Sequence, residues 1–315
     1  MGKYLVFTGG VGGAKLCLGL SQILGPEDIL FVVNTGDDFE HLGLKICPDL
    51  DTLMYTLSRE SDEERGWGRK EETWRCLNSL RELGGPSWFN LGDRDLAVHL
   101  YRTHLLNQNH KLSEITSSLY RAFGIRYNTI PMSDDLVSTT IVTAGGEELS
   151  FQDYFVKESC VPVVKSIQYK NATRAKMPKK LKEFLFSSEL EGIIFAPSNP
   201  FLSIEPILRV ADIRLAVQKV KVPKIAISPI VNGASVKGPT DKIMAELGME
   251  INNFSIIQQY KNLLTHIIID QTDGSCASEI ENLGLNVYIQ NTLMKNLTDK
   301  IKLAESTLMA VSEAQ

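Results

Sequence analysis

The chain has 315 residues, 43% hydrophobic and 23% charged, which is enough for one large domain or for a core domain carrying an insertion. Its net charge of −5 disfavours a nucleic-acid partner, because displacing counterions from phosphates needs a surplus of lysine and arginine. No apolar run approaches the roughly 20 residues that span a bilayer, so we expect no membrane partner. The five cysteines are scattered and lack a C-x-x-C pair, which predicts reduced thiols in a cytoplasmic protein.

The first elements along the chain predict a parallel sheet. Residues 4–8 form a short apolar strand that runs into a glycine-rich turn at 9–13. A helix is expected over about 14–24 and a second buried strand over 29–34. Two buried strands joined by a helix make a βαβ unit, whose strands are parallel.

Later segments extend this pattern into a Rossmann-like α/β fold, a mostly parallel sheet with helices on both faces. The expected core comprises residues 1–51 and 126–315, with a helical insertion at 52–125 between the second and later strands. A hairpin turn is expected at 144–147. Further strands are predicted at 137–143, 192–196, 224–228, 266–270 and 286–289, and helices at 72–83, 95–106, 112–123 and 292–313.

The glycine-rich turn is the first candidate site, since glycines let backbone N–H groups approach an anion at a helix N-terminus. The third glycine of the dinucleotide fingerprint would fall on Lys15, and the Gly-Lys-Ser/Thr of a Walker loop is missing. The pattern therefore predicts phosphate or nucleotide binding without specifying NAD or ATP, and a tight structural turn is the alternative. The residues concerned are Gly9, Gly10, Gly12, Gly13 and Lys15.

A group of carboxylates follows the second strand. Asp37 and Asp38 lie where the strand ends, at the sheet edge where α/β proteins bind ligands, and Asp49 and Asp51 follow shortly after. Such hard oxygen ligands suit Mg²⁺ bound together with substrate phosphates. The alternative is that they are turn residues and an N-cap, and the exact ligand set among the four stays open.

Arg94 opens a predicted helix, and its guanidinium suits a bidentate contact with phosphate or carboxylate. An Asp93 cap beside a surface arginine is the alternative reading of this motif. His99 and His104 do not share a helical face, which disfavours a metal pair. Three polar, proline-containing loops supply further candidate substrate-binding residues, namely Ser133, Asp134, Ser198, Asn199 and Ser228.

Taken together, these motifs resemble the 2-phospho-L-lactate transferase family, whose members help to make the deazaflavin coenzyme F420. The resemblance runs in order over nearly the whole chain. It is carried by segments 9–15 (GGVGGAK), 34–38 (NTGDD), 48–52 (PDLDT), 66–68 (GWG), 91–95 (LGDRD), 131–135 (PMSDD), 151–154 (FQDY) and 196–200 (APSNP).

The resemblance implies transfer of a phospho-acid from a guanosine-diphosphate-linked donor to the deazaflavin FO, with release of GMP and help from Mg²⁺. It implies that Asp51 meets FO and metal, that Asp38 is a second metal ligand, and that Arg94 lines the FO pocket. The 9–13 turn and the Ser198–Asn199 loop would hold the nucleotide, and the insertion at 52–125 would cover the site of the acceptor, FO. A homodimer is expected from the family, and the acid (2-phospholactate, phosphoenolpyruvate or 3-phosphoglycerate) stays open.

Two other functions are compatible with parts of the pattern. A related group of regulators of carbon metabolism and cell shape has a similar scaffold and is thought to bind a nucleotide sugar without turnover. Segments 48–52, 92–95 and 151–154 favour the transferase over this group. An NAD-dependent dehydrogenase is disfavoured by the incomplete fingerprint and by Asn34, which stands where an acidic ribose ligand is expected.

Overall fold

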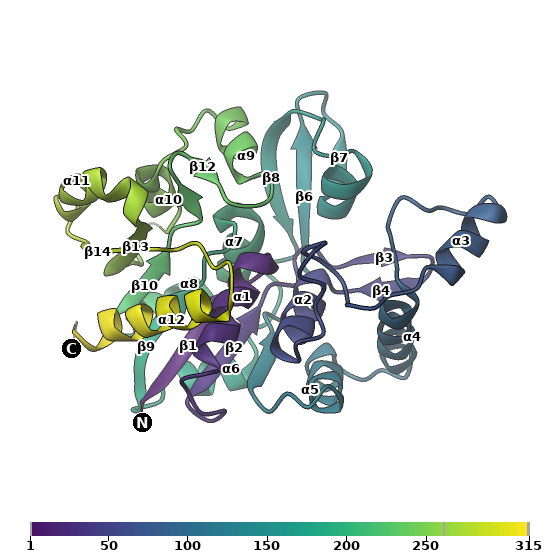
Figure 1. The fold of residues 1–315 in the computed structure, drawn as a ribbon, viewed down its shortest axis with the longest axis horizontal. Helices are drawn as coiled ribbons and strands as arrows, with labels where there is room; N and C mark the ends of the chain where they lie inside the picture. Colours follow the sequence, from purple (N-terminus) through teal and green to yellow (C-terminus); the bar gives the residue numbers. More distant parts are fainter. Residues whose placement is uncertain (1, 261, 314–315) are drawn as a thin grey trace.

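The computed structural model describes residues 2–260 and 262–313. Its centre is a seven-stranded sheet in the order β14-β13-β10-β9-β1-β2-β5, in which every neighbouring pair is parallel (Figure 1). The predicted α/β fold is confirmed. The strands are β1 (Lys3–Thr8), β2 (Ile29–Val33), β5 (Asn128–Pro131), β9 (Leu190–Phe195), β10 (Lys224–Ile227), β13 (His266–Asp270) and β14 (Asn286–Gln290).

The sheet is apolar because helices cover both of its faces. All five residues of β2 are buried, and so are all five of β13. One face packs against α1 (Gly10–Leu20), α2 (Pro48–Leu57), α5 (Leu112–Ala122) and α12 (Leu297–Ser312). The other face packs against α6 (Lys179–Leu185), α7 (Glu205–Arg209), α8 (Ile213–Lys219), α9 (Thr240–Glu246) and α10 (Asn253–Tyr260).

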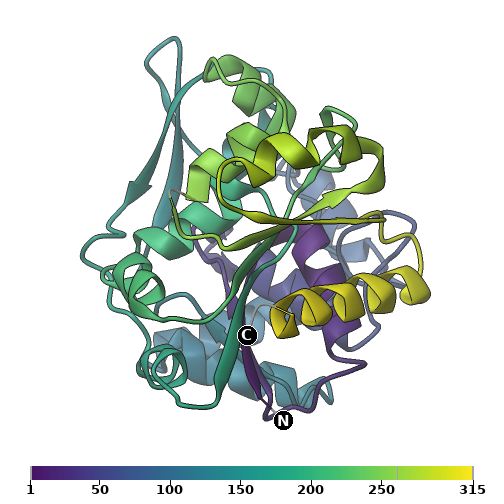
Figure 2. The same ribbon diagram turned by 90° about the vertical axis from the view of Figure 1, so that its left-hand side faces the viewer.

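Helix α12 lies alongside α1, although the two are far apart in sequence (Figure 2). A Cβ at Gly19 would lie only 2.1 Å from the backbone oxygen of Lys300, so this close approach requires glycine. None of the described helices is long and apolar enough to cross a membrane.

The predicted hairpin turn at 144–147 joins two strands that lie outside the central sheet. Strand β6 (Ser138–Thr143) pairs antiparallel with both β7 (Glu148–Ser150) and β8 (Val164–Lys170). A single π-helical turn, η1 (Asp153–Lys157), follows β7. The smaller elements on the β9–β14 side are η2 (Pro200–Ile204), β11 (Ile230–Val231), β12 (Ala234–Ser235), η3 (Gln271–Cys276) and α11 (Ala277–Glu281).

The long connection from β2 to β5 contains the three helices expected in the insertion. They are α3 (Arg75–Glu82), α4 (Asp93–Asn107) and α5, and α3 projects from one side of the molecule together with the hairpin of β3 (Phe39–His41) and β4 (Leu44–Ile46) (Figure 1). Two boundaries differ from expectation. Helix α2 begins at Pro48, so the boundary placed at 51/52 falls inside a helix, and α1 begins at Gly10, so most of the glycine-rich segment is helical.

Candidate active site

A cavity of about 870 Å³ opens at the carboxyl edge of the central sheet. The segments that follow β1, β2, β9, β10 and β14 form one side of it. The other side is formed by the insertion and by segment 151–156, which follows β7 of the second sheet (β6, β7 and β8). Nine of the predicted site residues line it: Gly9, Gly10, Gly12, Lys15, Asp37, Asp51, Ser198, Asn199 and Ser228. The predicted residues that do not line it are Gly13, Asp38, Asp93, Arg94, Ser133 and Asp134.

The glycine-rich N-terminus of α1 is held by side chains of the protein itself. The Gly10 N–H donates to Asp49 Oδ1 at 2.7 Å, and Ser198 Oγ bridges the N–H and the carbonyl of Gly9 at 3.2 and 2.7 Å. The glycines also permit close packing, since a Cβ at Gly12 would lie 2.4 Å from Pro197 O. A Cβ at Gly13 would lie 2.2 Å from Thr8 Oγ1. Gly12 and Gly13 therefore join α1 to the sheet, whatever they contribute to ligand binding.

Gly12→Val is expected to weaken nucleotide binding, and even Gly12→Ala to lower the stability by about 1–3 kcal/mol, because the new Cβ meets backbone that cannot give way. Thermal unfolding and calorimetry with GMP would measure both effects. Gly145→Ala is the matched control, since the nearest atom to its Cβ is Thr143 Oγ1 at 3.7 Å. A Gly12→Ala protein as stable as the control would contradict this packing.

Two carboxylates meet behind this turn. Asn34 Nδ2 donates to Asp37 Oδ1 at 2.5 Å and to Asp49 Oδ2 at 2.9 Å, and both aspartates line the cavity. Burial and the neighbouring charges of Asp49 and Asp38 raise the pKa of Asp37 well above its usual range. Burial raises the pKa of Asp49 to about 6. Burial is the first cause of both shifts, and for Asp37 the neighbouring carboxylates add to it.

The Asp38 side chain pairs with a lysine and does not line the cavity. Its Oδ2 lies 3.6 Å from Lys45 Nζ, and its buried Oδ1 has no hydrogen-bond partner among the described residues. Burial raises the pKa of Asp38 to about 6. The side chain does not line the cavity. Its predicted role as a metal ligand stays a prediction, and Asp49 is the carboxylate that the structure places beside Asp37.

Asp51 is held by a buried cation. Arg102, whose side chain is 2% exposed, pairs with both carboxylate oxygens of Asp51, one of them at 3.1 Å. His99 Nδ1 lies 3.7 Å from Asp51 Oδ2, and His99 Nε2 lies 3.3 Å from Asp95 Oδ2. Tyr55 donates to Asp95 at 2.5 Å. Arg102 thus fixes the orientation of the Asp51 side chain at the cavity wall.

The sequence did not indicate that three residues of α4 lie together beside Asp51: Asp95 was noted only within the motif at 91–95, His99 only as a poor metal partner of His104, and Arg102 not at all. Asp95, His99 and Arg102 are spaced four and three residues apart, which places them on one face of α4. Asp51, Asp95 and His99 offer ligand atoms within 4.8 Å of one another. The Arg102 guanidinium already neutralises Asp51 in that group, so a second cation there would meet repulsion.

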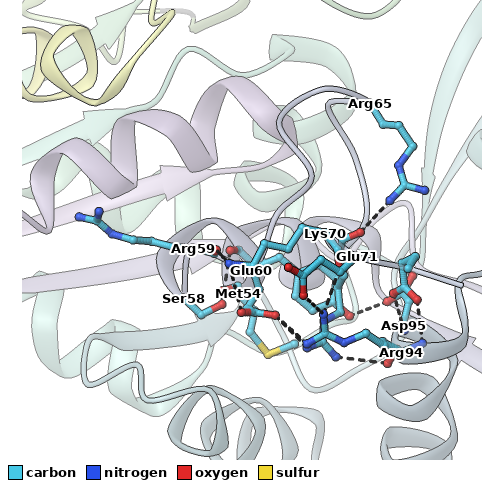
Figure 3. Close-up of polar contacts among 12 residues, drawn as sticks. Met54, Ser58, Arg59, Glu60, Arg65, Lys70, Glu71, Arg94 and Asp95 are labelled. Carbon is cyan, nitrogen blue, oxygen red and sulfur yellow. Dashed lines mark hydrogen bonds and ion pairs between the residues drawn. The ribbon is translucent and has the colours of Figure 1, made fainter.

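Arg94 is tied to a strap, here defined as residues 58–74, which connects α2 to α3 (Figure 3). Its Nη2 lies 2.9 Å from Glu60 Oε2, and its Nη1 donates to Lys70 O at 3.0 Å. The strap carries Arg65 and Trp67 into the cavity wall. Arg94 therefore anchors part of the wall without lining the cavity itself.

The remaining predicted residues stabilise helix ends and loops outside the cavity. Asp93 accepts hydrogen bonds from the Arg75 and Cys76 N–H groups, both at 3.1 Å, at the start of α3. Asp134 accepts from Ser113 N at 2.7 Å in α5. Ser133 donates to Lys176 O at 2.8 Å. These contacts fit the alternative that the three residues stabilise helix ends and turns and do not bind substrate.

Aromatic side chains line the cavity on the insertion side and beside the second sheet. From the insertion come Trp67, which is 44% exposed, and Phe89, whereas Trp88 packs against His41 and Phe39. Phe151 and Phe155 stack on each other at 5.3 Å near the second sheet. A planar ring system entering here would find aromatic surfaces on more than one wall.

Arg94→Ala is expected to weaken FO binding while leaving the affinity for GMP nearly unchanged, because it releases the strap and not the α1 turn. Bound FO should quench tryptophan fluorescence through Trp67. Calorimetry with each ligand measures the two affinities, and Arg121→Ala is a surface control on α5, whose residues do not line the cavity. An equal fall in the affinities for FO and GMP would mean a collapsed fold. A fall in the affinity for GMP alone would mean that Arg94 supports the nucleotide side of the cavity and not the FO side.

Comparison with known proteins identifies the family. Residues 5–301 match the family model described as 2-phospho-L-lactate transferase CofD. The chain belongs to this family. A phosphoenolpyruvate transferase of Streptomyces griseus is 37% identical, with 99% of each chain covered. A 2-phospho-L-lactate transferase of Methanosarcina mazei is 36% identical over 97% of this chain and 99% of its own length.

The CofD-family chain is thus an enzyme, a transferase of coenzyme F420 biosynthesis, as the motifs led us to expect. The non-enzymatic regulator is not favoured. A crystal structure of a UPF0052-family protein from Bacillus halodurans superposes with a TM-score of 0.62 over 98% of this chain and 99% of the other. At 14% identity that likeness shows the fold alone.

Proposed function

We propose that this protein transfers a phospho-acid from a guanosine-diphosphate-linked donor to the terminal ribityl hydroxyl of FO, releasing GMP. One observation carries the proposal: a single cavity joins the glycine-rich end of α1, a carboxylate cluster and aromatic walls. The first suits phosphates, the second suits a divalent cation, and the third suits a planar deazaflavin. The names of the relatives supply the substrate class.

The bonds exchanged are those of a phosphoryl transfer. The hydroxyl oxygen of FO forms a bond to the phosphorus that carries the acid, and the bond from that phosphorus to the bridging oxygen breaks. GMP leaves with the bridging oxygen and its electron pair. Such a reaction needs positioning and charge neutralisation more than a covalent intermediate. We assign the hydroxyl proton to Asp51, whose carboxylate Arg102 holds in place at the cavity wall.

We further propose that Mg²⁺ binds between Asp37 and Asp49. The residues fit this ion, because the Asn34 amide holds two buried carboxylates together at the cavity wall. When bound, the cation would neutralise charge on the phosphoryl oxygens. Lys15 also lines the cavity and donates to Met294 O at 3.0 Å, and in this proposal it would supply a positive charge for the donor phosphates.

Affinity for Mg²⁺ is expected to fall as the pH decreases through about 6, the pKa of Asp49, since only ionised carboxylates bind the cation. The pKa is raised on folding, so this group favours the folded state below its ordinary value of 3.8 and loses that contribution as the pH rises through 6. Mg²⁺ should therefore raise the melting temperature at pH 7.5 far more than at pH 5. An equal rise at both values would contradict the assignment.

A mixture of the protein, Mg²⁺, FO and the three activated acids (2-phospholactate, phosphoenolpyruvate and 3-phosphoglycerate) tests the reaction and identifies the acid. Mass spectrometry of the products shows which acid is transferred, and GMP release shows the bond broken. Absence of product with all three acids, in a protein that binds GMP, would overturn the proposal in favour of a nucleotide-binding regulator. We propose a cytoplasmic homodimer as the working form, which light scattering would test.

A further inference from the structure

Asn34 is the first residue after β2, and its side chain is fully buried behind the cavity wall. Its Oδ1 accepts a hydrogen bond from the Gly36 N–H at 2.8 Å, which fixes which way the amide faces. The nitrogen then has to face the carboxylates, and it donates to one oxygen of Asp37 and one of Asp49. A neutral side chain thus joins two like charges.

The position of this residue makes the arrangement unusual. In dinucleotide-binding proteins the end of the second strand carries an acidic side chain that contacts the ribose. Here the amide turns back into the protein, where Leu202 O lies 3.3 Å from the same nitrogen. Asn34 has no access to the cavity, so it contacts no substrate directly.

The geometry points to Asn34 as a positioning residue for the cation, an inference that rests on the proposed Mg²⁺ site between Asp37 and Asp49. Without a donor between them, two buried carboxylates would turn away from each other to reduce repulsion. The amide bonds keep them together before the cation arrives. Each bonded oxygen retains a further lone pair, so a ligand position remains on both residues. Asn34 therefore pre-orders the ligands, as partners of metal-binding side chains commonly do.

Asn34→Ala is expected to weaken Mn²⁺ binding, read directly from the free-ion signal in electron paramagnetic resonance, by about 10- to 100-fold. The control is Asn286→Ala, which removes an exposed amide that lies 2.9 Å from His266 Nε2, on the edge strand β14 at the end of the sheet remote from β2. The control should bind Mn²⁺ like the unmodified protein. An Asn34→Ala protein that folds and binds Mn²⁺ with unchanged affinity would overturn the inference.

Asn34→Asp keeps the shape of the side chain but replaces the two donors by a third carboxylate. Its melting temperature should fall in the absence of metal and rise with Mn²⁺ by several times the shift of the unmodified protein, because the cation now relieves more repulsion. A purely structural asparagine would instead give the same melting loss with and without Mn²⁺, and that result would overturn the inference. If the unmodified protein itself binds no Mn²⁺, the proposed metal site fails, which is a distinct outcome.

Discussion

Asp37→Asn is expected to lower kcat by a factor of about one hundred or more, and to weaken Mg²⁺ binding, without loss of stability. The change removes one of two carboxylates that line the cavity and share the Asn34 amide. Losing an electrostatic group of this kind typically costs two to three powers of ten in rate. Since burial and neighbouring charges raise the pKa of Asp37, a neutral side chain there should also relieve repulsion in the folded protein.

Asp38→Asn is the matched control, because it makes the same chemical change one residue along the chain. Asp38 faces Lys45 and lies outside the cavity lining, so Mg²⁺ affinity and kcat should change little. Steady-state kinetics over a range of Mg²⁺ concentrations, together with thermal unfolding, would compare the two variants. If Asp38→Asn loses Mg²⁺ and Asp37→Asn does not, the ligand pair is Asp38 with Asp51, as the family resemblance implies.

Asp51→Asn is expected to reduce both turnover and stability. Turnover should fall about one hundredfold or more, because the proposed proton acceptor is lost. Stability should fall by about 3–5 kcal/mol, because Arg102 is left buried without its anionic partner. The kcat must therefore be measured on the folded fraction, at a temperature well below the melting transition.

The double variant Asp51→Asn with Arg102→Met separates the two effects. Replacing a buried ion pair by groups of similar volume is often close to neutral, so much of the stability should return. Turnover should stay low, since the carboxylate is still absent. Full recovery of kcat in the double variant would mean that Asp51 acts only through its ion pair with Arg102, and the proton would need another acceptor.

The sequence predicted the central sheet well because its strands are local features. Runs such as residues 29–33 are apolar throughout, and that pattern by itself indicates strands covered on both faces. The rule that ligands bind at the carboxyl edge then grouped Gly9, Asp37, Ser198 and Ser228 correctly around one cavity. The strands β3, β4 and β5, the last at the edge of the central sheet, were missed, since three or four residues are too few for an alternation to stand out.

The side-chain partners could not be predicted in the same way. Which of two adjacent aspartates faces the cavity depends on the exact turn after β2, which composition does not specify. The ion pair between Asp51 and Arg102 links positions 51 residues apart, and it forms only because α4 packs near α2. A signal for α4 did exist, however. The spacing of Asp95, His99 and Arg102 marks one polar face on a helix, and a buried polar face calls for partners.

The packing of α12 against α1 bears on how the enzyme is made. Residues 292–295 line the cavity and lead directly into α12, which lies on α1 beside Gly19. The glycine-rich end of the cavity is thus assembled from residues near 10 and residues near 295. On the ribosome, the glycine-rich segment is made well before residues 292–295, so it has to wait for this partner during translation. Bringing together segments so far apart in the sequence is slow, so we expect this end of the cavity to form late in folding.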